Sequence, residues 1–247
     1  MNIELNGLRV MIDEPIEISV PLRFDATQSY PFGIQHPRRK RLFDLQGEDR
    51  GCICDEISFC PHTHTTHVES AAHVDPKTPS TLNILRRLPP LLTALLVDAP
   101  LCKQSNQIAE ALLVDNIKVH CTIEKPSSID ALILRTGSVS LVISSFSLGF
   151  SFITTQTLSK INELCPALRV LLIDSVSIDP ENDNGQLLAH RSFLLSGVPN
   201  DRLVVELCHL PHSITPGVYA LSLNAAAFDA SDAIPCRPVI YSLSHAR

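Results

Sequence analysis

The stretch Leu91-Leu92-Thr93-Ala94-Leu95-Leu96-Val97 is almost continuously apolar and is the clearest fold signal in the chain. Two shorter runs of the same kind follow at Ala131–Leu134 and Leu168–Ile173. Short apolar runs without alternation are typical of strands that are buried on both faces. We therefore expect these three segments to form the interior of a β-sheet that is covered on both sides.

Further strands are expected before and after these runs. Ile16–Leu22 alternates between apolar and polar residues, which indicates a strand with one buried face. The other predicted strands are Ile53–Phe59, Leu203–Leu207, Tyr219–Leu223 and Val239–Leu243.

Two helices are predicted between the strands. The first begins at Thr154 or Thr155, either of which can cap a helix, and it ends before Pro166. The second spans Gln186–Leu195. Strands outnumber helices and are mixed with them, so the predicted fold class is α/β with a mixed sheet, in a single domain of residues 1–247.

Composition narrows the possible partners to small molecules. The 247 residues carry a formal net charge of −6, so we expect no nucleic-acid binding. The run Pro37–Arg41 is the only basic cluster. We interpret it as a solvated loop, with contact to an anionic substrate or partner as the alternative. No segment offers the roughly 18 apolar residues that cross a bilayer, so no membrane association is expected.

The cysteines indicate a reducing compartment. The chain has eight, which lie mostly in apolar runs, as at Cys102, Cys165 and Cys208. Reduced thiols pack in such runs as small hydrophobic groups. Cys52 and Cys54 are one residue apart, which is not the usual spacing of a zinc knuckle. Because the first residues also lack the pattern of a signal peptide, we expect a cytoplasmic protein.

The segment His62-Thr63-His64-Thr65-Thr66-His67-Val68-Glu69-Ser70-Ala71-Ala72-His73 holds four imidazoles and one carboxylate in twelve residues. Neutral imidazole and carboxylate groups bind zinc, iron, manganese and related ions. A histidine outside the metal sphere can serve as a general acid or base near neutral pH. The alternative interpretation is a polar loop with unrelated surface histidines.

The spacing within this segment favours a catalytic metal site. In an extended chain, His67 and Glu69 project to the same side, and a helical turn after Ser70 would bring His73 close to Glu69. A metal held by His67 and Glu69, with His73 close but unbound, would keep an open coordination position. That arrangement is typical of catalytic rather than structural metal sites.

Two distant residues could complete such a site. Glu206 lies in an apolar run, where an unpaired carboxylate is costly to bury. Metal coordination explains it better than a solvent-facing position on an edge strand. His190 lies in the second predicted helix, where a packed or capping histidine is the alternative to a metal ligand.

Together these residues resemble the metal-dependent cyclase-like hydrolase family, which includes bacterial kynurenine formamidase and isatin hydrolase. The family has a histidine, then Gly-Thr-His, one residue, an acidic residue and a closing histidine. Here the matching residues run from His62 through Thr65-Thr66-His67-Val68-Glu69 to His73. Five further motifs follow in the family's order: Ala131–Gly137, Leu172–Pro180, Leu188–Arg191, Val204–Leu207 and Asp232–Val239.

The resemblance implies a site for one or two divalent ions per subunit. The first ion would be bound by His62, His67 and Glu69. Glu69 would bridge to a second ion, held by His190 and Glu206. Zinc is expected first, with manganese or iron as alternatives.

The resemblance also implies that His73 is the acid–base residue. Four departures stand out. Thr65 replaces the usual Gly, Glu69 replaces the usual Asp, and Ser70-Ala71-Ala72 replaces the usual small step that contains a proline. Position 63, the most common place of the first histidine, is Thr63. His62 or His64 must therefore substitute, and we prefer His62.

The implied activity is the hydrolysis of an amide bond. It is similar to that of the arylformamidase of tryptophan catabolism, which converts N-formylkynurenine to kynurenine and formate. A metal-bound hydroxide would attack the carbonyl, and His73 would carry the proton. A second hypothesis is a cyclase, dehydratase or lactonase that acts on a small hydroxy or keto acid. A third is a catalytically silent metal-binding protein of the same fold.

The family's swivelling β/β/α fold and homodimeric or larger assembly are implied as well. The substrate pocket is less defined, because the chain has no tryptophan and only 5% aromatic residues. Phe24, Tyr30, Phe32 and Phe59 lie nearest the histidines in sequence and are candidate pocket walls, with core packing as the alternative.

Overall fold

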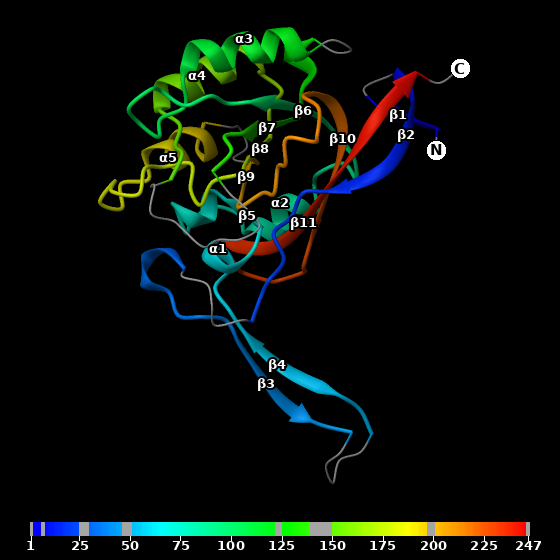
Figure 1. The fold of residues 1–247 in the computed structure, drawn as a ribbon, viewed down its shortest axis with the longest axis vertical. Coiled ribbons are helices and arrows are strands. Elements are labelled where there is room, and N and C mark those ends of the chain that lie inside the picture. The colour runs from blue at the N-terminus through cyan, green and yellow to red at the C-terminus, as the bar shows by residue number, and fades with distance from the viewer. Residues whose placement is uncertain are drawn as a thin grey trace.

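A nine-stranded mixed sheet dominates the computed structural model (Figure 1). The structure describes residues 2–5, 8–24, 30–45, 51–121, 125–138, 150–196 and 201–245. In sheet order the strands are β1 (Asn2–Leu5), β2 (Leu8–Glu17), β11 (Ala233–His245), β10 (Gly217–Ala225), β6 (Leu92–Asp98), β7 (Ala131–Arg135), β8 (Val170–Ile173), β9 (Leu203–Glu206) and β5 (His67–Ser70). Because β5 also pairs with β11, the seven strands from β11 to β5 form a closed, barrel-like ring.

The three apolar runs form β6, β7 and β8, which are consecutive strands of this ring. Strands β6, β7, β8 and β9 are parallel, with Ala94 opposite Ala131 and Ala131 opposite Val170. The remaining pairings are antiparallel. The prediction of buried strands is confirmed, because every residue of β7 and β8 is buried.

Apolar residues cover both faces of these strands. Alternate residues such as Leu132 and Leu171 face a cluster built with the helices, which includes Ile117 of α3 and Phe193 of α5. The residues between them, such as Ile133 of β7, face a second cluster. This cluster includes side chains of β5 and β11. Burial on both sides explains why the sequence of these strands shows no alternation.

Three helices lie together on one side of the sheet: α3 (Glu110–His120), α4 (Thr155–Leu164) and α5 (Leu188–Leu194) (Figure 1). The Thr154 side chain accepts a hydrogen bond from the Thr157 amide, so the predicted threonine cap of α4 is confirmed. The short elements are α1 (Pro61–His64), α2 (Thr81–Leu85), η1 (Pro31–Gly33), η2 (Ala71–His73) and η3 (Pro126–Ser128).

The predicted strand Ile16–Leu22 is wrong in its bounds, because β2 ends at Glu17. Ile18 and Val20 are nevertheless buried, and the Val20 amide donates to the Thr66 hydroxyl. The apolar alternation therefore reflects an extended segment that is fixed by side-chain and bridge contacts rather than by a continuous ladder.

Helix α3 was not predicted from the sequence. Its apolar residues do not follow one stripe, because Leu112 and Val119 are exposed while Leu113 and Ile117 are buried. A helix with apolar residues on several sides gives no clear period of 3.6 residues.

The basic cluster is a strand, not the expected loop. It forms β3 (Arg38–Phe43), which pairs with β4 (Cys54–Ser58) in a separate two-stranded sheet. This hairpin projects away from the body of the fold (Figure 1). The Arg41 guanidinium donates to the Asp55 carboxylate at 2.6 Å, and Arg39 Nε lies 3.9 Å from the same carboxylate, so Asp55 offsets part of the positive charge within the hairpin.

All eight cysteines are free thiols, as the sequence predicts. Burial raises the pKa of the Cys165 thiol to about 12, which keeps it protonated and unreactive. Within the described part of the chain, no helix is both long and apolar enough to cross a membrane.

The packing of β7 against the helices predicts a large cost for truncating Leu132, which is fully buried between them. Leu132→Ala should lower the free energy of unfolding by about 2–5 kcal/mol, measured by urea denaturation. Leu112→Ala, at an exposed position of α3, is the matched control and should change it by less than about 0.5 kcal/mol. Equal losses in the two variants would contradict this description of the core.

Candidate metal centre

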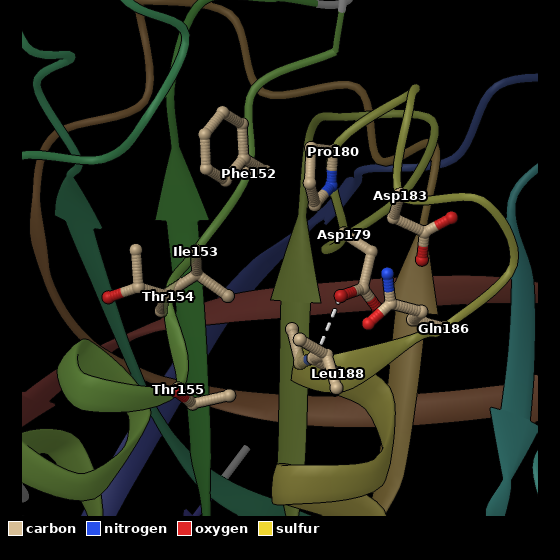
Figure 2. Close-up of a pocket in the computed structure, with 10 residues that line it drawn as sticks. Phe152, Ile153, Thr154, Thr155, Asp179, Pro180, Asp183, Gln186 and Leu188 are labelled. Atoms are coloured by element: carbon tan, nitrogen blue, oxygen red, sulfur yellow. Dashed lines mark hydrogen bonds between the residues drawn. The ribbon is translucent and has the colours of Figure 1, made fainter.

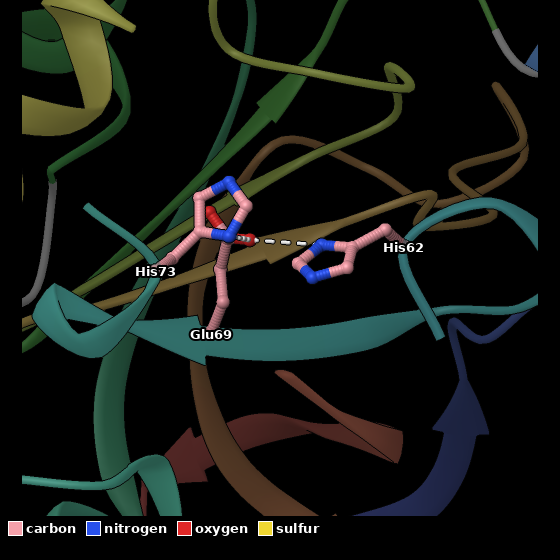
Figure 3. A group of neighbouring side chains, drawn as sticks. All are labelled: His62, Glu69 and His73. Atoms are coloured by element: carbon pink, nitrogen blue, oxygen red, sulfur yellow. Dashed lines mark ion pairs between the residues drawn. The ribbon is translucent and has the colours of Figure 1, made fainter. Parts of the chain in front are cut away.

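Six side chains, four from residues 62–73 and two from distant parts of the chain, converge beside β5. They are His62 of α1, His67 and Glu69 of β5, His73 of η2, His190 of α5 and Glu206 of β9. Figure 3 shows the rings of His62 and His73 next to the Glu69 carboxylate, with a dashed line for the ion pair between His62 and Glu69. These are the six residues that the sequence motifs select, and we refer to them as the histidine–glutamate cluster.

The register of the sheet brings two carboxylates and one imidazole together. In the antiparallel pair of β5 and β9, His67 lies directly opposite Glu206. The two side chains therefore share one face, and His67 Nε2 lies 3.4 Å from Glu206 Oε2. Glu69 is two residues further along β5 on the same face, with its Oε2 4.0 Å from His67 Nε2.

Helix α5 brings His190 to the same carboxylates. Its Nε2 lies 2.5 Å from Glu69 Oε1 and 3.2 Å from Glu206 Oε1. The other ring nitrogen, Nδ1, lies 2.6 Å from Asp179 Oδ2. Because the Asp179 carboxylate also accepts from the backbone amides of Ala189 and His190, it fixes both the start of the helix and the His190 ring.

His73 reaches the cluster because the chain turns helical directly after β5. The Ser70 hydroxyl accepts from the Ala72 amide and starts the turn η2. His73 Nδ1 then lies 3.9 Å from Glu69 Oε2, as the four-residue spacing predicts. His62 approaches the same oxygen from α1, with its Nδ1 at 3.2 Å.

The structure places His62 in the cluster and His64 elsewhere. His64 Nδ1 accepts from the Cys60 amide, and its Nε2 lies 2.9 Å from the Gln35 carbonyl oxygen. Its ring also packs edge-on against Tyr30 at 4.4 Å. Both nitrogens of His64 are therefore engaged with backbone, which leaves no ring nitrogen for a metal ion.

The cluster fits a cation because its buried polar atoms are in contact mainly with one another. Among the described residues, His67 Nε2, His190 Nε2 and both carboxylate oxygens of Glu69 are buried and make no hydrogen bond of regular geometry, only the close ion-pair contacts within the cluster. Leaving such polar atoms unsatisfied costs about 1–3 kcal/mol each, and more for charged groups. All four face the same space, so a divalent ion would satisfy them together.

Ligand atoms group around Glu69 in two sets. One set contains His62, Glu69 and His73, the other His67, Glu69 and Glu206, and the atoms in each set lie within 4.8 Å of one another. Glu69 belongs to both sets. This geometry is compatible with one ion or with two that share the Glu69 carboxylate.

Charged neighbours shift the pKa values of buried groups in the cluster. Burial lowers the pKa of His62, but hydrogen bonds with Asp232 and Glu69 outweigh this effect and raise it to about 10. Burial would raise the pKa of Glu69, yet the imidazolium of His190 holds it well below its usual value. Without a cation these imidazoles hold protons, so a metal ion that binds here must displace them.

Sequence reasoning gave no role to Asp179 and Asp232, although both lie in motifs that resemble the family. Asp179 ends the Asp-x-x-Ser-x-Asp motif and binds His190. Asp232 starts the C-terminal motif, and its Oδ2 lies 3.0 Å from both His62 Nε2 and His73 Nδ1. Their position within motifs was the available signal.

Two other motif residues are structural. Arg135, at the end of β7, is 4% exposed; it binds Asp98 and the carbonyl groups of Pro211 and Ile214. Asp174 accepts from the Thr136 and Gly137 amides. These contacts tie loops to the ends of parallel strands and do not reach the cluster.

Two cavities border the cluster through Asp179. The first, of 270 Å³, lies between Phe152 and the start of α5 (Figure 2). The second, of 360 Å³, is lined by Phe32, Phe150 and the loop that contains Asp179. None of the six cluster residues lines either cavity.

The four aromatic residues predicted near the site differ in their surroundings. Tyr30 is buried against His64, so its role is packing. Phe32 is 63% exposed and contacts Phe150 edge-on at 5.6 Å in the second cavity. Phe24 stacks with Arg39. Phe59 lines neither cavity.

No protein-family model matches this sequence. No curated protein matches it either. Its fold nevertheless matches solved structures along almost the whole chain. A predicted metal-dependent hydrolase from Bacillus stearothermophilus aligns over 92% of this chain and 98% of its own, with 17% identity and a TM-score of 0.64.

Two further structures give similar values. Isatin hydrolase A from Labrenzia aggregata covers 92% of this chain and 93% of its own, at 11% identity and a TM-score of 0.67. A protein described as a novel cyclase covers 93% and 87%, at 13% identity and a TM-score of 0.67. The fold predicted from the motifs, that of metal-dependent cyclase-like hydrolases, is confirmed.

Removal of divalent cations should destabilise the protein, because Glu69 and its neighbours then lose their common counter-charge. Zinc at a free concentration 100-fold above its Kd should add about 2.7 kcal/mol to the free energy of unfolding. Glu69→Gln should abolish most of this gain, measured as the shift of Tm between chelator and zinc.

Glu163→Gln is the matched control, since Glu163 is an exposed carboxylate on α4. This variant should respond to zinc as the wild type does. The same response in Glu69→Gln would contradict the assignment of Glu69 as a ligand.

Proposed function

We propose that this chain is a metal-dependent hydrolase of an amide bond, in a linear or cyclic aryl amide similar to an aryl formamide. The observation that carries the proposal is the convergence of buried atoms of His67, Glu69 and His190 that contact one another but make no hydrogen bond of regular geometry. Such a set is costly without a cation and gives a bound cation several protein ligands. The hydrolase fold of the solved relatives supports the same conclusion.

The proposed ligands are His62, His67, Glu69, His190 and Glu206. Zinc is the first candidate, with manganese and iron as alternatives, because imidazole and carboxylate groups suit all three. When bound, the cation would supply Lewis-acid activation of water and of the substrate carbonyl. Asp179 keeps the His190 ring oriented, so that Nε2 faces the carboxylates.

We assign the proton transfer to His73. It lies at the rim of the cluster and is partly exposed, whereas His67 and His190 are fully enclosed. Its Nδ1 is 3.9 Å from Glu69, so it is close to the proposed ligands without being buried among them. A partly exposed imidazole can take a proton from the attacking water and donate it to the leaving nitrogen.

The second cavity supports an aromatic substrate. Phe32, which is exposed, and Phe150, which is buried, line this cavity beside the loop at residues 177–180. The Ile178 amide of this loop donates to Glu206 at 2.7 Å, so the loop joins the cavity to the cluster. The Phe32 backbone lies in the left-handed region, with a φ of 59°, which costs about 1–3 kcal/mol for a non-glycine residue.

Rival functions differ in what the metal-loaded protein turns over. A panel of an aryl formamide, isatin, an aliphatic lactone and a simple aryl ester separates them. Hydrolysis of the formamide or isatin supports the proposal. Turnover of the lactone alone supports a lactonase, and bound metal without any turnover supports a silent binding protein. Homodimeric assembly and a cytoplasmic location stay predictions.

His73→Ala should lower kcat on the best substrate of the panel about 10²–10⁴-fold, because it removes the group that transfers the proton. Metal content, measured on the same preparation, should be unchanged. His212→Ala replaces an exposed histidine outside the cluster and should keep wild-type turnover. Wild-type kcat in His73→Ala would refute the assigned role.

Phe32→Ala should raise KM for an aryl formamide about 10-fold, since the substrate ring loses a stacking partner worth about 0.5–1.5 kcal/mol together with its buried area. For N-alkyl formamides the change should be less than about twofold. Phe228→Ala, at another exposed phenylalanine, is the control. An equal rise in KM for aryl and alkyl substrates would contradict the placement of the substrate ring.

A further inference from the structure

We propose that Asp232 is the positioning residue of the cluster: its carboxylate holds the rings of His62 and His73 and sets which nitrogen of each faces the reaction. The inference rests on the proposed hydrolytic function. Asp232 is not one of the proposed metal ligands. Its carboxylate contacts the rings of His62 and His73, and it acts through these two histidines.

A single oxygen atom of Asp232 serves both rings. Its Oδ2 lies 3.0 Å from His62 Nε2 and 3.0 Å from His73 Nδ1. An ionised carboxylate can only accept hydrogen bonds, so both imidazole nitrogens must be the donors. The two rings lie 4.6 Å apart and are tilted by 39°, which lets them converge on one acceptor.

The two hydrogen bonds determine the free nitrogen of each ring. With Nε2 of His62 donating to Asp232, its Nδ1 faces the Glu69 carboxylate, 3.2 Å away, and is the nitrogen that could bind a metal ion once the ion displaces its proton. With Nδ1 of His73 donating, its Nε2 is the nitrogen that can accept a proton. Asp232 thus aims one histidine at the proposed metal and makes the other a base.

The backbone around Asp232 is fixed independently of these contacts. Ala233, the next residue, lies opposite Glu69 in the pairing of β11 with β5. The Thr81 hydroxyl donates to the Asp232 carbonyl oxygen, and the Thr81 amide donates to that of Ser231. The sheet register therefore delivers the carboxylate next to the strand that carries Glu69.

This arrangement differs from an ordinary surface ion pair. The Asp232 side chain is 46% exposed, and exposed ion pairs contribute little to folding. Its replacement should therefore leave stability nearly intact. Carboxylates that orient metal-bound or catalytic histidines, in contrast, change metal affinity or activity about 10–100-fold when they are replaced.

The test uses the zinc-loaded wild type, Asp232→Asn, Asp232→Ala and the conservative Asp232→Glu. Asp229→Asn is the matched control, because Asp229 is an exposed carboxylate three residues away in the same turn. Three quantities are measured: the zinc Kd by competition with a chelator, the kcat and KM on the best substrate, and the histidine tautomers by ¹⁵N NMR of labelled protein.

We expect both Asn and Ala variants to lower kcat about 10–100-fold with KM changed less than twofold, and to weaken zinc binding about 10-fold. In the NMR spectra His73 should be an Nδ1–H tautomer in the wild type and a mixture of tautomers in Asp232→Ala. Asp232→Glu should recover part of kcat, while Asp229→Asn should match the wild type in all three readouts.

Wild-type tautomers and zinc affinity in Asp232→Ala would overturn the inference, whatever the substrate proves to be. So would a loss of kcat that follows a loss of Tm, since that marks a structural role. If the wild type binds zinc but hydrolyses nothing, the proposed function fails by itself. The tautomer and zinc readouts then still decide the role of Asp232.

Discussion

The burial of the Glu69 carboxylate is the constraint on which the rest of the structure depends. The side chain is fully enclosed, in a strand of four residues that pairs with β9 on one edge and β11 on the other. A buried carboxylate is tolerated only with compensating charge. His62 and His190 supply it, and they come from two different elements, α1 and α5. The pairings of β5 that close the sheet therefore also bring the residues of the site together.

The protein's own groups do not fully balance the negative charge that is buried in the cluster. Glu206 adds a second buried carboxylate, and the charge of Glu69 opposes its ionisation while His190 favours it. Buried ion pairs of this kind seldom repay the cost of desolvation by themselves. The buried atoms of the cluster that make no regular hydrogen bond lie where a further positive charge would offset the carboxylates. A cation at this position would serve both stability and chemistry, which explains why charged groups are retained inside a closed sheet.

The fold limits the chemistry without deciding it. The three solved structures of similar fold described above share 11–17% identity with this chain, and they include proteins described as a hydrolase and as a cyclase. Their common feature is the scaffold, on which different reactions are possible. What distinguishes this chain lies around the cluster: the Asp232 contact to two histidines, and the Phe32–Phe150 pair beside the 177–180 loop. Substrate choice depends on these surroundings more than on the ligands themselves.

Local sequence was sufficient for the elements whose signals are local. The buried strands β6, β7 and β8 are continuous apolar runs, and α4 has a threonine cap and a proline stop, so each could be predicted within a few residues. The types and spacing of His67, Glu69 and His73 were also readable, because a strand followed by a helical turn places them on one side.

Tertiary structure decided what depends on pairing between distant segments. Only the folded chain separates His62, which reaches Glu69, from His64, whose nitrogens are engaged with backbone. The place of Glu206 opposite His67 follows from the β5–β9 register, and that of Asp232 from the β11–β5 register. The hairpin β3–β4 was readable only in part, because exposed strands lack a buried face and so carry no hydrophobic period. Sequence specified the chemical groups, and long-range strand pairing specified which of them meet.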